Sequence, residues 1–244
     1  MIIDCHNHIF EKFEYMDGVP PEEMIRTMDA LNIDKSVIFT VKGFFGDSAE
    51  GNDELLNIIR KYPERFIAFG TVHPREGEKA LQEMERSVKL GIKGFKFQSV
   101  WQGLFVNTPV FYPIMEKLRE LKVPAFIHSG TPPTSEPFQI INIARMFPDV
   151  PVILAHTGLP DFWEECVLAA KRFDNIYFET AGAQAIAMRE IVNAVGPERL
   201  IFGSDSPFGG LNNQYYQLEN VRLSIPEKYH DLVLGGNAAR IIGV

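Results

Sequence analysis

A pair of histidines near the start of the chain has the spacing of a metal site. His6 and His8 follow the apolar residues Ile2 and Ile3 and flank Asn7. Residues two apart in a β-strand project from the same face, so both imidazoles can reach one ion. Neutral imidazole binds several first-row metals. A bare His-x-His pair is about as often a pair of hydrogen-bonding core histidines, and the apolar strand before it favours the metal.

Three further polar residues follow apolar runs in the same way. His128 follows residues 125–127, His156 follows residues 152–155, and Asp205 follows the last apolar run of the chain. A single histidine of this kind could be a satisfied core residue. Together with His-x-His and the aspartate, two of them indicate a site. Asp205 could also cap a helix, but the proline and glycines after it disfavour a helix start, so we interpret it as a ligand or base.

Other side chains near the predicted strand ends are candidates for binding substrate. Lys96 is costly to bury without a partner, so we expect it to face the mouth of the site and hold a substrate carboxylate. His73 either contacts substrate or is a polar loop residue. Trp101, in a loop after Lys96, can wall an apolar pocket. We expect Cys5 to face a helix layer and assign it no chemistry.

Short apolar runs and longer amphipathic stretches alternate along the whole chain and must position these residues. Eight runs have the character of strands, at residues 1–4, 36–41, 66–72, 94–98, 125–128, 152–155, 176–179 and 200–203. Continuous apolar runs are typical of parallel strands covered on both faces. Helical patterns lie between them, for example at 78–90, where Gly91 ends the pattern. The alternation predicts an α/β fold, either a closed barrel or a doubly wound sheet.

Two features favour the barrel. A Rossmann-type sheet would carry a glycine-rich turn after its first strand, where this chain has His6 and His8. In barrels the active site is built at the C-terminal ends of the strands, and most of the predicted strands end in chemically capable residues: His6, Lys96, His128, His156, Glu179 and Asp205. The 244 residues are close to the roughly 250 of one such barrel. We therefore predict a single (β/α)8 (TIM) barrel domain over residues 1–244.

The overall charge excludes some partners. A formal net charge of −8 argues against a nucleic-acid or membrane-surface binder, because both of those partners select basic faces.

Two cysteines argue against a disulfide framework and indicate a reducing compartment. We find no apolar run near the ~20 residues of a membrane span and no signal-peptide pattern. We therefore expect a cytoplasmic protein whose partner is a small-molecule substrate.

Six segments lie in order along nearly the whole chain: DCHNH (4–8), GFKF (94–97), FIH (126–128), AHTG (155–158), FGSDSP (202–207) and GNAAR (236–240). Together they resemble the amidohydrolase superfamily. Within it they resemble the amidohydrolase-related branch that contains aminocarboxymuconate-semialdehyde decarboxylase and hydroxybenzoate-type decarboxylases. The resemblance implies a metal-dependent TIM-barrel enzyme.

The resemblance also implies roles for the candidate residues. His6, His8 and His128 would bind the metal, and Asp205 would be a further ligand that also carries protons as a catalytic residue. His156 would be a second catalytic group beside them, either as a ligand of a second metal or as the group that polarises water or substrate. We expect one divalent ion, zinc first, with manganese and iron as alternatives, and a second metal stays open. Bound zinc lowers the pKa of its water to about 7.

Lys96 has two roles in families of this kind. In binuclear members of the superfamily a lysine on the fourth strand is carboxylated and bridges two metals. In the branch that this chain resembles, a single metal is usual. We therefore assign Lys96 to substrate binding, together with His73 and Trp101.

Three activities remain open at this stage. The first is a metal-dependent hydrolase of a C–N, C–O or lactone bond, which the short chain favours, because decarboxylases of the branch tend to be longer. The alternative is a metal-dependent nonoxidative decarboxylase of a small carboxylic acid. A metal-free lactonase is the third. The resemblance also makes a homodimer possible.

Overall fold

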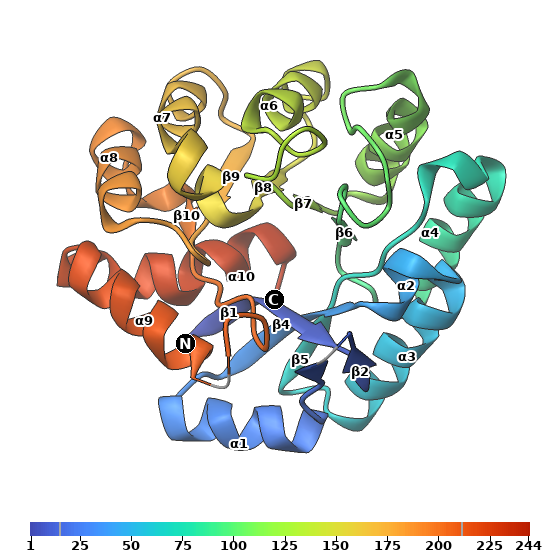
Figure 1. Ribbon diagram of the computed structural model, residues 1–244, viewed down its shortest axis with the longest axis horizontal. Helices are drawn as coiled ribbons and strands as arrows, with labels where there is room; N and C mark the ends of the chain where they lie inside the picture. The colour runs from blue at the N-terminus through green and yellow to red at the C-terminus, as the bar shows by residue number, and fades with distance from the viewer. Residues whose placement is uncertain (15, 211) are drawn as a thin grey trace.

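Parallel strands and helices alternate along the chain in the computed structural model, which describes residues 1–14, 16–210 and 212–244. The parallel strands are Ile3–Ile9 (β1), Lys35–Thr40 (β4), Phe66–Ala68 (β5), Phe95–Phe97 (β6), Ala125–Ile127 (β7), Val152–Leu154 (β8), Ile176–Glu179 (β9) and Leu200–Ile201 (β10). The α-helices are Pro21–Leu31 (α1), Lys42–Phe45 (α2), Ser48–Lys61 (α3), Glu78–Leu90 (α4), Tyr112–Leu121 (α5), Pro137–Met146 (α6), Leu159–Ala170 (α7), Ala185–Val195 (α8), Asn213–Ser224 (α9) and Asn237–Ile242 (α10). Figure 1 shows the strands at the centre and the helices around them.

Backbone pairing joins the parallel strands into one ring. β1, β4 and β5 form one parallel sheet, and β6 to β10 form another. Between β5 and β6 the backbone of Gly70 pairs with that of Phe95. Between β10 and β1, Asn7 pairs with Ser206, and the His8 N–H donates to the Ser206 carbonyl over 2.7 Å. The strand order therefore returns to its start, and the fold is the predicted (β/α)8 barrel.

The strand side chains divide between an outer and an inner core. Along each strand, successive side chains point to opposite faces. Phe95, Phe97 and Ile127 belong to the outer core between strands and helices. Phe39 and Phe126 belong to a smaller inner core, which fills the interior of the barrel. The barrel is therefore packed with side chains, and only its C-terminal end is available for chemistry.

A β-bulge in β1 decides which of its side chains face the interior. The pairing with β4 shifts register between Asp4 and Asn7. Ile3 and Cys5 belong to the inner core, and the His6 ring packs edge-on against aromatic rings of that same core. A regular strand would send Cys5 and His6 to opposite faces, whereas the bulge turns both inward. The expectation that Cys5 faces a helix layer is therefore wrong.

The predicted strands lie at the right places in the chain, but some of them begin or end at other residues than predicted. Each predicted strand overlaps one of the parallel strands. β1 extends to Ile9, so His6 and His8 lie within the strand and not after it, while β5 ends at Ala68. None of the helices in the described ranges has the length and apolar character needed to cross a membrane.

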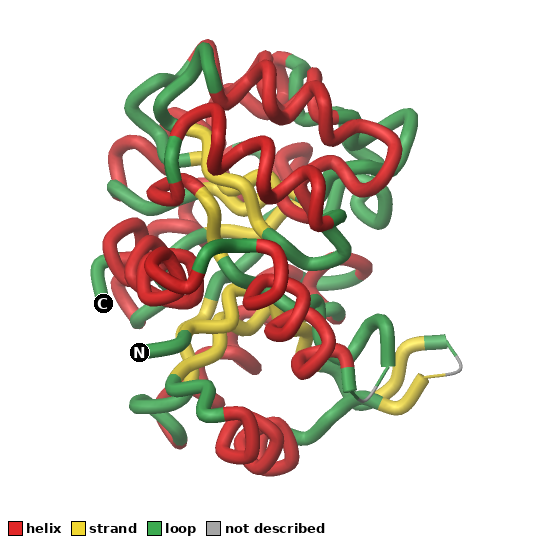
Figure 2. Tube along the Cα trace, turned by 90° about the vertical axis from the view of Figure 1, so that its left-hand side faces the viewer, coloured by secondary structure: helices red, strands yellow, loops and turns green. Residues whose placement is uncertain are grey.

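A short hairpin follows β1. Its strands, Lys12–Phe13 (β2) and Met16–Asp17 (β3), pair antiparallel. Figure 2 shows the hairpin projecting from the barrel on the side away from both chain termini. Because β1 leaves the barrel at its C-terminal end, the hairpin stands beside the end that carries the histidines. Strands of two residues have no periodicity to detect, so the sequence does not predict them.

Candidate metal centre

Three side-chain atoms from the two ends of the chain converge at the C-terminal end of the barrel. His6 Nε2 lies 3.2 Å from His8 Nε2, and Asp205 Oδ1 lies 3.1 Å from each of these nitrogens. Both histidines are buried, and the aspartate side chain is 26% exposed. Two donors bound to one zinc ion at about 2.1 Å lie about 3.0 Å apart at a right angle and about 3.4 Å apart at the tetrahedral angle. The spacing therefore fits a donor set for one divalent cation.

The ionisation of these groups also suits a cation. Burial lowers the pKa of His6 well below its usual range, and nearby Lys96 lowers it further. Burial also lowers the pKa of His8, although Asp205 opposes the shift. Burial alone would raise the pKa of Asp205, but the hydrogen bond with His8 and the field of His156 outweigh it, so the pKa is lowered. Two neutral imidazoles and one carboxylate are ligands that zinc, manganese and iron accept.

The two ends of the chain hold Asp205 in place together. Asp205 has a φ of 62°, a left-handed conformation that is uncommon outside glycine. The preceding Ser204 donates to the buried Asp4 carboxylate from its N–H (2.9 Å) and its hydroxyl (2.7 Å). The Asn213 side chain, at the start of α9, donates to the Ser204 carbonyl. Since Asp4 belongs to β1, these bonds fix Asp205 relative to His6.

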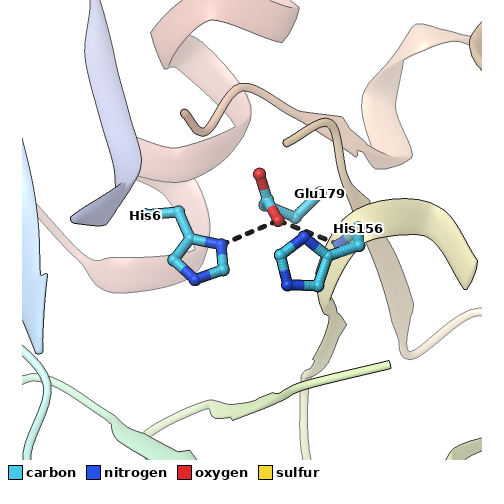
Figure 3. Close-up of side chains that lie close together, drawn as sticks. All are labelled: His6, His156 and Glu179. Atoms are coloured by element: carbon cyan, nitrogen blue, oxygen red, sulfur yellow. Dashed lines mark hydrogen bonds and ion pairs between the residues drawn. The ribbon is translucent and has the colours of Figure 1, made fainter. Parts of the chain in front are cut away.

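A second carboxylate lies behind His6, on the side away from Asp205. Glu179 Oε2 lies 3.0 Å from His6 Nδ1 and accepts the His156 N–H over 3.0 Å, as Figure 3 shows. Glu179 Oε1 accepts the Ala181 N–H over 2.5 Å. Burial raises the pKa of Glu179 to about 8. His6, His156 and Glu179 form a second group whose potential ligand atoms lie within 4.8 Å of one another.

His156 and His128 form a second imidazole pair. His156 Nε2 lies 3.1 Å from His128 Nδ1, and His128 Nε2 lies 3.0 Å from the Thr131 hydroxyl. The His156 ring lies between the rings of His6 and His128. Its centroid is 5.0 Å from that of His6 and 4.9 Å from that of His128. Burial lowers the pKa of His156 to about 4 and that of His128 well below its usual range. For His128 to join the donor set, one of its nitrogens must leave its present partner.

Lys96 lies in the floor of the site and not in its mouth. Its side chain is 1% exposed, and Nζ lies 3.0 Å from His6 Nε2. The amino group stands over the rings of Phe39 and Phe126, 4.8 and 4.3 Å from their centroids, where the ring faces attract a cation. Burial lowers the pKa of Lys96 to about 7, against the attraction of the nearby carboxylates Asp205 and Glu179. The expectation that Lys96 faces the mouth is therefore wrong.

The two other predicted substrate contacts have different surroundings. His73 uses both ring nitrogens on the loop backbone, because Nδ1 accepts the Arg75 N–H over 3.3 Å and Nε2 lies 3.0 Å from the Gln102 carbonyl. These bonds give it a structural task in the loop after β5. Trp101, by contrast, is half-buried, and its ring lies 6.3 Å from that of His8.

Aromatic side chains line the side of the site next to His8. The ring centroids of Phe208 and Phe44 lie 5.0 and 6.3 Å from that of His8. Phe13, from the hairpin, lies 5.0 Å from Trp101 and 5.8 Å from Phe208. An apolar wall beside a few converging polar groups is typical of sites for small organic ligands. The arrangement suits a flat, apolar ring that carries polar substituents.

Glu179 is a buried side chain of this centre for which the sequence predicts no role. It lies at the end of an apolar run, but that position alone does not reveal a partner. The contact joins residues 173 positions apart, so only the closed barrel shows it.

Comparisons with known proteins identify the family of this chain. The sequence model of the amidohydrolase family matches residues 3–244. The 2-amino-3-carboxymuconate-6-semialdehyde decarboxylase of Dictyostelium discoideum is 21% identical, over 92% of this chain and 77% of that protein. The gamma-resorcylate decarboxylase of Polaromonas sp. (strain JS666) is 24% identical, over 78% of this chain and 74% of that protein.

Solved structures share the fold over nearly the whole chain. The 5-carboxyvanillate decarboxylase of Sphingomonas paucimobilis superimposes with a TM-score of 0.78 at 19% identity, covering 100% of this chain and 99% of that one. A dihydroxybenzoic acid decarboxylase of Polaromonas sp. JS666, crystallised with manganese and the inhibitor 2-nitroresorcinol, gives 0.77 at 18% identity, covering 99% and 96%. At these identities the likeness establishes the fold.

Proposed function

Because this chain belongs to the amidohydrolase family, we propose that it is a metal-dependent enzyme that removes carbon dioxide, without oxidation, from a small aromatic carboxylic acid. The observation that carries the proposal is the combination of a His6–His8–Asp205 donor set with relatives that are named as decarboxylases. The comparisons support this alternative better than the hydrolase that the chain length favoured. Zinc as the metal stays a prediction, since the related structure was crystallised with manganese.

His6, His8 and Asp205 would hold the metal, and His128 would be its fourth ligand after giving up one present hydrogen bond. The spacing of the first three atoms supports this assignment. When bound, the divalent ion supplies Lewis-acid stabilisation of negative charge on substrate oxygen atoms. One metal accounts for this donor set, and a second would need His156 to leave His128.

Asp205 would carry the proton that the reaction needs. When the bond to the carboxylate breaks, carbon dioxide leaves and the electron pair stays on the ring carbon, which must gain a proton. The lowered pKa of Asp205 leaves it ionised at neutral pH, so it would first take a proton from an acidic group of the substrate and then give it to that carbon. Its 26% exposure leaves it accessible to the substrate. His156 lies near enough to assist, but its lowered pKa disfavours a stored proton.

Lys96 and the aromatic wall would select the substrate. In its protonated form, Lys96 would attract the carboxylate that is to be removed. The rings of Phe44, Trp101 and Phe208 beside His8 would pack against a flat substrate ring. His73 would not contact the substrate, because loop backbone occupies both its nitrogens.

Product analysis tests the proposal. Protein loaded with Mn²⁺ or Zn²⁺ would be incubated with hydroxybenzoic acids labelled with ¹³C in the carboxyl group, including gamma-resorcylate and 5-carboxyvanillate, in H₂¹⁸O. The expected result is metal-dependent release of ¹³CO₂, with no ¹⁸O in the aromatic product. If ester, amide or lactone substrates are turned over with ¹⁸O uptake while no acid loses carbon dioxide, the chain is a hydrolase and the proposal fails.

A further inference from the structure

Three polar groups of the described residues contact the Glu179 carboxylate, and each is a hydrogen-bond donor or can become one. The N–H groups of His156 and Ala181 are fixed donors, one to each carboxylate oxygen. The third neighbour, His6 Nδ1, shares Oε2 with His156 at 3.0 Å. Glu179 is fully buried, so no solvent competes for these bonds. The burial that raises the pKa of Glu179 is opposed by these two N–H groups and by the charge of Lys96. In the ionised form that these contacts favour, Glu179 satisfies all three neighbours when His6 carries its proton on Nδ1.

The position of this proton decides whether Nε2 of His6 can bind a metal ion. A neutral imidazole has one protonated nitrogen and one lone pair. With the proton on Nδ1, the lone pair is on Nε2, the atom that lies 3.2 Å from His8 Nε2 and 3.1 Å from Asp205 Oδ1. With the proton on Nε2, a hydrogen would point into the donor set and no ion could bind there. The pairing with Glu179 therefore selects the tautomer that can bind metal.

The same residue anchors the segment that carries His156. Residues 156–159 all have positive φ, at 61°, 48°, 78° and 54°, and left-handed conformations are costly for the three that are not glycine. Glu179 holds this segment twice, because its carboxylate accepts the His156 N–H and its carbonyl accepts the Thr157 hydroxyl over 2.7 Å. The His156 ring is thus placed beside His6 by contacts to the end of β9.

We propose that Glu179 is a positioning residue of the metal centre, which fixes the His6 tautomer and the place of His156 from outside the ligand set. The role of a metal ligand, which the closeness of His6, His156 and Glu179 would also allow, fits less well. Glu179 faces Nδ1 of His6, and its contact with His156 is to the backbone N–H. The inference rests on the proposed metal role of His6, but it is independent of the reaction catalysed.

The space for this carboxylate is built into the barrel at Gly203. A Cβ at this position would collide with Glu179 Oε1 and would lie 2.9 Å from His6 Cβ. Gly203 does not have a positive φ, so its backbone conformation does not require glycine. The missing side chain therefore leaves room for Glu179 beside His6.

The Glu179→Gln variant is the decisive substitution, because it keeps the shape and removes the charge. If the amide oxygen faces His6 and His156, its NH₂ meets the Ala181 N–H. If the oxygen faces Ala181, the NH₂ meets His6 Nδ1 and forces the proton onto Nε2. Loss of an outer partner of a ligating histidine typically weakens metal binding about 10–100-fold. We therefore expect the Kd for Mn²⁺ of Glu179→Gln to be about 10–100-fold higher than that of the wild type. The electron paramagnetic resonance signal of free Mn²⁺ measures this Kd.

A readout on the wild-type protein does not depend on how the variant folds. The ¹⁵N shifts of the His6 ring in metal-free protein report which nitrogen carries the proton, and we expect Nδ1. Protonation on Nε2 in the wild type would overturn the proposal. So would a Glu179→Gln variant that binds Mn²⁺ within about threefold of the wild type, which is well below the 10–100-fold loss typical of such partners.

Thr157→Ala is the matched control. It removes the hydroxyl bond to the Glu179 carbonyl and leaves the carboxylate and its imidazole partner intact. We expect its Mn²⁺ affinity to stay near that of the wild type. If Thr157→Ala weakens binding as much as Glu179→Gln, the loop and not the carboxylate sets the affinity, and the proposal fails. Wild-type protein that binds no metal would instead refute the proposed function, while the His6 tautomer would still test the role of Glu179.

Discussion

A methyl group added at Gly203 should destabilise the whole centre. The Gly203→Ala side chain would overlap the buried Glu179 carboxylate and crowd His6. Overpacking of a filled interior costs about 1–3 kcal/mol. If Glu179 moves away, it also weakens a hydrogen bond to a charged group, worth about 1.5–3 kcal/mol. If both costs apply, the expected loss is roughly 2.5–6 kcal/mol in the free energy of unfolding.

Thermal unfolding followed by circular dichroism measures this loss. For a chain of this size, 1 kcal/mol corresponds to about 2–4 °C in Tm, so Gly203→Ala should lower Tm by roughly 5–24 °C. A Gly203→Ala protein with unchanged Tm and unchanged Mn²⁺ affinity would refute the packing argument.

Three further substitutions separate the roles within the centre. His8→Ala should remove most bound metal, whereas His128→Ala should retain more of it, because of these two histidines only His8 contacts the other donors. The metal content after dialysis measures this difference, and a larger loss in His128→Ala would contradict it. Asp205→Asn should keep substantial metal but lower kcat by about 10²–10⁴-fold if the carboxylate carries the proton, and steady-state rates at matched metal content decide. Lys96→Met should keep the metal and lower kcat/KM by about 10–100-fold, as expected for the loss of one charge-assisted contact; an unchanged kcat/KM would remove Lys96 from the substrate site.

The barrel could be predicted from the sequence because its strands and helices are recognised from the pattern of residues that are neighbours in the chain. Most of the parallel strands are short apolar runs, and most of these runs are followed by an amphipathic stretch, so the alternation along the chain is enough to find them. The histidines at or near the strand ends were found for the same reason. The family assignment, which rests on those segments, is confirmed by the match over residues 3–244.

The register and the long-range contacts could not be predicted. The bulge between Asp4 and Asn7 changes the face of every side chain before it, and no composition marks it. For that reason Cys5 was placed on the wrong face. Lys96 was expected at the mouth because a buried lysine is costly, but two aromatic rings and nearby carboxylates compensate part of that cost inside the barrel.

The contacts of the His128 ring could not be predicted from the sequence either. Its place after a strand made it a candidate ligand, but strand order does not say which neighbour an imidazole turns to. In the structure it faces His156 and Thr131, and its role as a metal ligand stays a proposal.

The metal content of the purified protein tests the central claim most directly. Inductively coupled plasma mass spectrometry, on wild-type protein and on His6→Ala prepared without chelator, counts the ions per chain. The account predicts about one divalent ion in the wild type, as for a single site of this donor set, and a large loss in the variant. Wild-type protein that holds no metal and takes none up on reconstitution, or a His6→Ala variant with full occupancy, would contradict it.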